Sequence, residues 1–129
     1  MDALKYQQLA ANTDHKDYTP VGDRLGNPEM AKMLHYTMGL STESAEVLDI
    51  IKAYVAYNRP IDLDHLAEEL GDCLWFISRL CSHLGTDMEV LMDKNIAKLK
   101  ARYGEKFSTD MALERDKLAE LVAMKGVGI

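Results

Sequence analysis

Residues 62–85 read DLDHLAEELGDCLWFISRLCSHLG, and this stretch decides the fold class. Its apolar side chains recur at spacings of three and four residues: Leu66, Leu70, Cys73, Leu74, Ile77, Cys81 and Leu84. Such spacing is typical of a helix that buries one stripe against neighbours. The sequence therefore predicts an amphipathic helix that begins at Asp62 or Asp64 and ends at Gly85.

A second long helix is predicted immediately before it. Asn27-Pro28-Glu29 combines a capping residue, a proline in the first turn and an acid near the helix start. The helix should continue to about Asn58, because Pro60 disfavours helical backbone at the preceding residue. Gly39-Leu40-Ser41 is a point where this helix could kink or divide.

The rest of the chain is predicted from cap and turn signals. Thr86-Asp87-Met88-Glu89 is typical of a capping box, which would open a helix ending near Gly104. The remaining predictions are a short helix over 2–13, a loop over 14–26, a helix over 109–124 and a frayed end over 126–129.

Composition supports an all-α protein. Leu, Ala and Met together number 38, whereas the β-branched Ile, Val and Thr number 18. With short connections, the helices should form an antiparallel bundle of about four core helices that pairs with further copies of the chain. We expect a single domain over 1–129: an N-terminal helix and loop (1–26), the central helices (27–104), and a C-terminal helix and tail (105–129).

Charge and hydropathy exclude several classes of function. The formal net charge is −6, which disfavours polymeric nucleic acid as a partner. There is no stretch of 18 apolar residues for a membrane span and no apolar signal core near the N-terminus, so the cytoplasm is the expected location. Cys73 and Cys81 are eight residues apart in one predicted helix, too far for a disulfide, and are expected to be reduced.

Acidic residues form two ridges on the predicted central helices. Glu43, Glu46 and Asp49 follow one another at spacings of three, so they share a helix face. Glu69 and Asp72 repeat this spacing on the next helix, and antiparallel packing would let the two ridges face each other.

These acids border the apolar stripe instead of alternating with cations. The positions four residues after Glu43, Glu46 and Glu69 are Val47, Ile50 and Cys73. Partly buried carboxylates are costly unless a cation compensates them, and oxygen ligands suit Mg²⁺ or Mn²⁺. A solvated acidic face is the alternative interpretation of the same spacing.

Several segments resemble the MazG-like nucleoside triphosphate pyrophosphohydrolases. The family has a GLxxExxExxDxxK helix, an EELGDxLWF segment, an NxxKLxxRY close followed by Phe, and in one branch a YQxxAxxT opening. The matching stretches of this chain are 39–52, 68–76, 95–103 with Phe107, and 6–13. One departure is Ala45, where the family often has glycine between its first acids.

The resemblance implies an all-α fold that assembles as homodimers or homotetramers. It also implies Mg²⁺-dependent hydrolysis of an NTP or dNTP to the monophosphate and pyrophosphate, for house-cleaning or control of nucleotide pools. By position, the catalytic and metal-binding acids are Glu43, Glu46, Glu69 and Asp72. One of them, Glu46 or Glu43, could instead be the general base. Residues matched to phosphate or substrate binding are Lys52, Asn95, Lys98 and Arg102.

Other side chains allow more than one interpretation. Trp75 could stack on a nucleobase, although such residues more often lie in a core or subunit interface. His35 and Tyr36 could border the base pocket. The other histidines, His15, His65 and His83, are expected to be surface or cap residues.

Two other functions are compatible with the sequence. One is a non-catalytic helical module that binds nucleotide or protein. The other is a specialist of the same fold directed at dUTP or an alarmone. The expected partner is a small nucleoside triphosphate, with no membrane and no polymeric nucleic acid involved. Base and sugar preference are left open.

Overall fold

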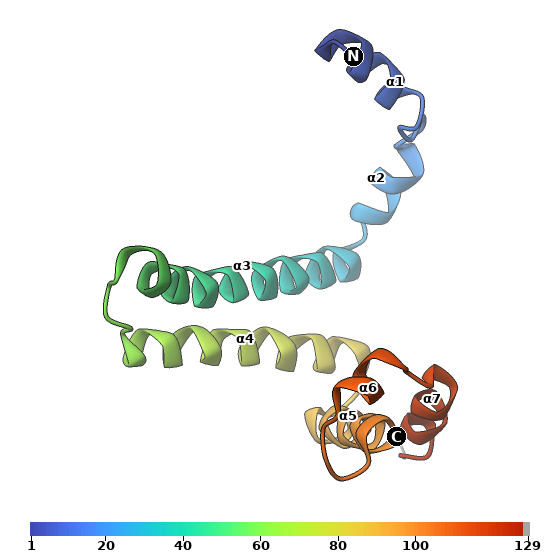
Figure 1. Cartoon of the computed structure of the whole chain (residues 1–129). Coiled ribbons are helices and arrows are strands. Elements are labelled where there is room, and N and C mark those ends of the chain that lie inside the picture. The colour runs from blue at the N-terminus through green and yellow to red at the C-terminus, as the bar shows by residue number, and fades with distance from the viewer. Residues whose placement is uncertain (128–129) are drawn as a thin grey trace. The chain divides into compact units, whose positions relative to one another are not determined.

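The chain is all-α, as predicted, and a computed structural model describes residues 1–127. No strand occurs among these residues (Figure 1). The helices are α1 (Ala3–Ala11), α2 (Thr19–Leu25), α3 (Pro28–Tyr57), α4 (Leu63–Leu84), α5 (Met88–Tyr103), α6 (Thr109–Leu113) and α7 (Lys117–Lys125). Of the predicted frayed end, Gly128 and Ile129 lie outside the described residues.

Two compact units make up the chain, Met1–His35 and Tyr36–Ile129, with the boundary inside α3. In the first unit the predicted loop over 14–26 is wrong in part, because α2 forms there. Pro20 lies in the first turn of α2, and the Asp17 carboxylate accepts a hydrogen bond from the Thr19 N–H at 2.9 Å. The proline and this turn-forming hydrogen bond together start a helix where composition alone indicates a loop. The three-part division of one domain stays a prediction.

Helix α3 begins and ends where the sequence predicts. The Asn27 side chain accepts a hydrogen bond from the Glu29 N–H at 2.9 Å. The helix continues without a break through Gly39 and ends at Tyr57. The next residue, Asn58, has a left-handed backbone with φ of 53°. Asparagine tolerates this conformation better than most residues.

Helix α4 is fixed at both ends by local signals. The Asp62 carboxylate accepts hydrogen bonds from the backbone N–H groups of Asp64 and His65, and Gly85 ends the helix with φ of 67°. In the second unit α3 and α4 run side by side and antiparallel (Figure 1). Ser44 Oγ and Cys73 Sγ lie 3.7 Å apart across this pair.

The C-terminal helices differ from the prediction in two places. The capping box at Thr86 does not form: α5 begins after Asp87, whose side chain makes no capping bond. The predicted helix over 109–124 is divided into α6 and α7, because the Asp116 carboxylate accepts hydrogen bonds from the N–H groups of Leu118 and Ala119 and so starts a new helix. Helix α5 packs against α6 and α7 and touches α4.

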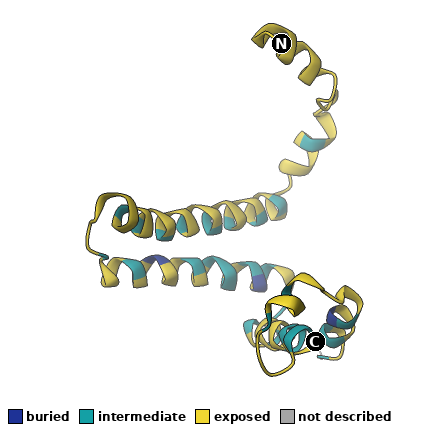
Figure 2. Cartoon of the chain, viewed as in Figure 1, coloured by how far each residue is buried: buried dark blue, intermediate teal, exposed yellow. Residues whose placement is uncertain are grey.

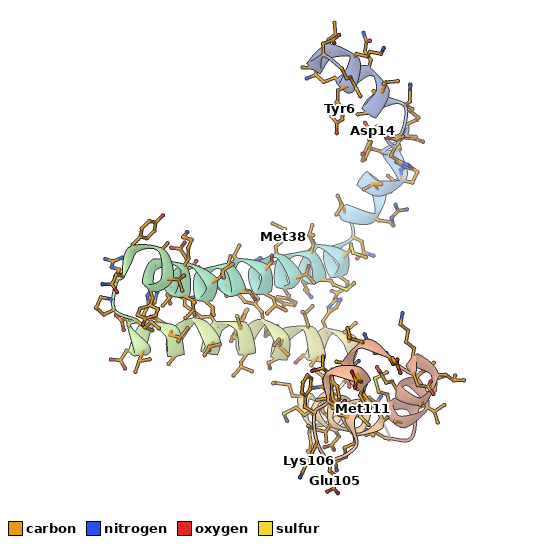
Figure 3. All side chains as sticks on the ribbon, in the orientation of Figure 1. Tyr6, Asp14, Met38, Glu105, Lys106 and Met111 are labelled. Atoms are coloured by element: carbon orange, nitrogen blue, oxygen red, sulfur yellow. The ribbon has the colours of Figure 1, made fainter. Side chains whose placement is uncertain are left out.

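Little apolar surface is buried in a single chain. Within residues 1–127, Cys81 is the one buried hydrophobic residue. Figure 2 shows that most of the ribbon is exposed or half-buried. The stripe that the sequence predicts to be buried on α4 stays half exposed at Leu70 (49%) and Leu74 (55%). Met38, also exposed, projects from the side of α3 turned away from α4 (Figure 3). None of the described helices is long and apolar enough to cross a membrane.

Candidate metal centre

The two acidic ridges converge between α3 and α4. One carboxylate oxygen from each of Glu43, Glu69 and Asp72 lies within 4.8 Å of the other two. The spacing of three residues places Glu69 and Asp72 on the same face of α4. The antiparallel pairing then brings Glu43 of α3 against that face. These distances agree with the expectation that the ridges face each other.

A second triplet shares one residue with the first. Ligand atoms of Glu46, His65 and Glu69 also lie within 4.8 Å of one another. His65 Nε2 lies 2.8 Å from Glu69 Oε1, at hydrogen-bond distance. His65 is exposed, as the sequence predicts, but sequence reasoning missed its contact with Glu69. The available signal was its position four residues before Glu69, which places both side chains on one face of the helix.

The electrostatics of the cluster are unfavourable without a cation. The side chain of Glu69 is 8% exposed, and its neighbours are mainly other carboxylates. Desolvation raises the pKa of the Glu43 carboxyl, and the nearby Glu46, Glu69 and Asp72 raise it further. A bound divalent cation would offset this repulsion. The carboxylate oxygens fit Mg²⁺ or Mn²⁺, and the His65 imidazole suits Mn²⁺ better than Mg²⁺.

Asp49 lies one turn beyond the cluster and pairs with Lys52, which lies a further turn along α3. The Lys52 ammonium donates to the Asp49 carboxylate, and both side chains are mostly exposed. This contact raises the pKa of the Lys52 ammonium. Neither residue belongs to the two triplets.

In the described part of the chain the predicted phosphate-binding residues of α5 make no direct polar contact with the acids. Among residues 1–127, no hydrogen bond or ion pair joins Asn95, Lys98 or Arg102 to the cluster. Asn95 is exposed and Lys98 is half-buried. The substrate-binding roles of these residues stay predictions.

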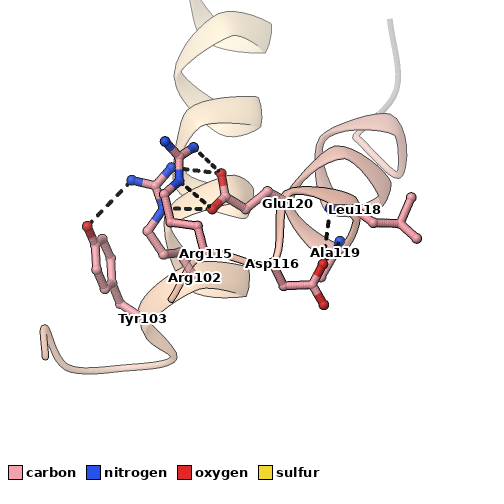
Figure 4. A network of polar contacts seen from close by, with 7 residues as sticks. All are labelled: Arg102, Tyr103, Arg115, Asp116, Leu118, Ala119 and Glu120. Carbon is pink, nitrogen blue, oxygen red and sulfur yellow. Dashed lines mark hydrogen bonds and ion pairs between the residues drawn. The ribbon is translucent and has the colours of Figure 1, made fainter. Parts of the chain in front are cut away.

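Arg102 instead belongs to a network that joins α5 to α7 (Figure 4). Its Nε and Nη2 donate to the two carboxylate oxygens of Glu120 at 2.8 and 2.7 Å. Arg115 donates to the same carboxylate at 3.2 and 2.8 Å. Glu120 is 3% exposed, and the two guanidinium groups hold the pKa of its carboxyl well below its usual range. The guanidinium group of Arg102 is therefore already bound to a buried carboxylate.

Aromatic rings gather beside the acids, one turn further along α4. The ring of Trp75 meets those of Phe76 and Tyr36 edge-on, with centroids 4.8 and 6.2 Å apart. Together these three residues form the aromatic cluster. Trp75 remains 51% exposed, so part of its ring is accessible to a ligand.

Comparison with known proteins agrees with this geometry. Residues 31–107 match the MazG nucleotide pyrophosphohydrolase domain, and the match includes both acidic ridges and the aromatic cluster. The chain belongs to the MazG family. This family assignment supports a hydrolase of the nucleotide pyrophosphohydrolase type.

The chain is also similar to a phage protein, whereas it matches no solved structure. The chain is 28% identical over 99 residues to the Gene 37 protein of Mycobacterium phage L5, covering 74% of this chain and 83% of the phage protein. That name states no activity.

Proposed function

We propose that this MazG-family protein hydrolyses nucleoside triphosphates, ribo- or deoxyribo-, to the monophosphate and pyrophosphate with Mg²⁺ as cofactor, and that Mn²⁺ can replace Mg²⁺. The role would be house-cleaning or control of the nucleotide pool. The observation that carries the proposal is the convergence of Glu43, Glu46, Glu69 and Asp72 from two antiparallel helices around a buried carboxylate. The family assignment supports it.

In this proposal different residues of the chain bind the cation, accept the proton, orient a carboxylate and stack against the base. The four acids would hold the cation, unless one of them, Glu43 or Glu46, instead accepts the proton of the attacking water. When bound, Mg²⁺ neutralises charge on the triphosphate and polarises the phosphoryl group. His65 orients the Glu69 carboxylate through their 2.8 Å contact. Trp75 offers an exposed ring for stacking against the base.

Two lysines and one asparagine outside the acidic cluster complete the proposed substrate site. Lys52 lies nearly two helical turns beyond Glu46, and Asn95 and Lys98 form no ion pair among the described residues. We assign these three residues to the phosphates, following their positions in the family motifs. Arg102 also holds a motif position, but its pairing with Glu120 favours a structural role.

We further propose that the active form is a homodimer or homotetramer. Leu63, Leu70 and Leu74 lie on one stripe of α4 and are 72%, 49% and 55% exposed. Large apolar patches of this kind are unusual on a soluble monomer and mark association surfaces. A second copy of the chain would cover them.

The test is pyrophosphate release over all NTPs and dNTPs, with Mg²⁺ and with a chelator. Glu46→Gln removes one carboxylate of the cluster and should lower kcat at least a hundredfold, because a ligand or base is lost. Glu68→Gln is the matched control: Glu68 is exposed, adjacent to Glu69 in sequence, and outside both triplets. It should retain wild-type activity.

The outcomes separate the alternatives. Release that persists in chelator, or in Glu46→Gln, would remove the metal mechanism. A wild-type protein that binds nucleotide without releasing pyrophosphate would be a non-catalytic module. Activity confined to dUTP or to an alarmone added to the panel would identify a specialist of the same fold.

A further inference from the structure

A cavity of about 760 Å³ lies beside the acidic cluster, where α3 ends and α4 begins. Glu46 and His65, two members of the second triplet, form part of its wall. Its volume is in the range of small-molecule sites. The cavity therefore opens directly onto the proposed metal centre.

Arg59 gives this cavity a positive group. Three carboxylates line the same cavity, those of Glu46, Asp49 and Asp62, yet within residues 1–127 none of them forms an ion pair with Arg59. Lys52, by contrast, is paired with Asp49 and would have to leave that exposed contact to reach a phosphate. The Arg59 guanidinium is thus available to a ligand, and its planar fork fits phosphate oxygens.

The backbone holds Arg59 at this place. The left-handed Asn58 turns the chain at the end of α3, and the Arg59 N–H donates to the carbonyl of Ala53 at 3.2 Å. Pro60 follows and fixes its own φ. The side chain therefore starts from a defined turn next to the cavity.

The acids separate this cavity from the aromatic cluster. On α4 the order is His65, then Glu69 and Asp72, then Trp75 and Phe76. The cavity lining contains no ring that would stack on a base, apart from the His65 imidazole. A nucleotide that placed its base at the aromatic cluster would extend its phosphates past the acids toward Arg59.

We propose that Arg59 binds the terminal phosphates of the substrate, which leave as pyrophosphate, and so sets the direction in which the nucleotide lies across the metal centre. This inference rests on the proposed function and adds to it a phosphate-contacting residue outside the four acids.

The test is calorimetric binding of inorganic pyrophosphate and, separately, of a nucleoside monophosphate, both with Mg²⁺. Arg59→Ala should weaken pyrophosphate binding about tenfold, the loss of roughly one charge-assisted contact. Arg59→Lys should recover part of it. Binding of the monophosphate should not change. Arg24→Ala, which removes the same charge from the exposed surface of the first unit, should bind both ligands as the wild type does.

Two results would overturn the assignment of Arg59. One is pyrophosphate affinity within twofold of wild type in Arg59→Ala. The other is an equal loss for pyrophosphate and monophosphate, which would indicate a general disturbance of the site. Either result in a protein that still hydrolyses triphosphates leaves the proposed function intact. Failure of that function would instead appear as a wild type without hydrolysis.

Discussion

Gly39 of α3 lies directly against the ring of Phe76 of α4. A β-carbon built on Gly39 would stand 2.2 Å from Cε1 and Cζ of that ring, well inside van der Waals contact. The two helices therefore approach closely at this point because Gly39 has no side chain. The acids Glu43 and Asp72 lie one turn away along each helix, so the same approach sets the spacing of the candidate metal centre.

Gly39→Ala should destabilise the protein. The added methyl forces the Phe76 ring or the α3 backbone to move, an overpacking cost of about 1–3 kcal/mol. The free energy of unfolding, measured by denaturant titration, should fall by that amount. Mg²⁺ binding should weaken as well, because the acidic ridges separate.

Gly71→Ala is the matched control for this prediction. Gly71 is inside α4, and a β-carbon there would meet no heavy atom within 4 Å. Alanine should stabilise the helix by about 0.5–1 kcal/mol. Equal effects of the two substitutions would contradict the packing argument for Gly39.

The network around Glu120 predicts a dependence of stability on pH. The hydrogen bond from Arg102, and to a smaller extent that from Arg115, lowers the folded-state pKa of the Glu120 carboxyl from its ordinary value of 4.5. A depressed pKa in the folded state means that this stabilisation is fully present above pH 4.5 and is lost as the pH falls toward the folded-state value. Glu120→Gln should lower Tm at pH 7, and its difference from wild type should shrink below pH 4.5. A difference constant from pH 7 to pH 3 would contradict this account.

A conservative substitution of Arg102 should distinguish a structural role, through its contact with Glu120, from a role in binding substrate phosphate. Arg102→Lys keeps the charge but loses the two-pronged hydrogen bonding to Glu120. If the role is structural, Tm should fall while pyrophosphate affinity at a temperature below the transition stays within twofold of wild type. If Arg102 contacts phosphate, as the family motif suggests, the affinity should fall about tenfold or more at unchanged Tm.

Local signals predicted α3 and α4 well. Asn27, Asn58, Asp62 and Gly85 each act on backbone groups within a few residues, so sequence alone contains the necessary information. The same reasoning predicted that the two acidic ridges would meet, since it needed only the three-residue spacing and an antiparallel pair.

The sequence predictions differ from the structure where a helix start lies inside a longer helical pattern, or where a side chain contacts a residue that is distant in sequence. Asp116 lies inside the predicted helix over 109–124, but its carboxylate caps α7 and divides the segment. Arg102 and Glu120 are 18 residues apart, and no helical periodicity relates them. The cavity beside Arg59 depends on how the end of α3 meets the start of α4, which spacing along the chain does not specify.

Leu74→Glu should separate the proposed oligomer. Leu74 is 55% exposed in the single chain and lies on the α4 stripe with Leu63 and Leu70. A charge placed there would have to be desolvated on association, which is costly without a partner. Light scattering coupled to size exclusion should report a dimer or tetramer for wild type and a monomer for the variant.

Leu74→Met keeps the apolar surface and should keep the assembly. Because so little apolar surface is buried within one chain, the Leu74→Glu monomer should also unfold at a lower temperature. A wild-type protein that is monomeric at micromolar concentration would disprove the proposed role of this surface.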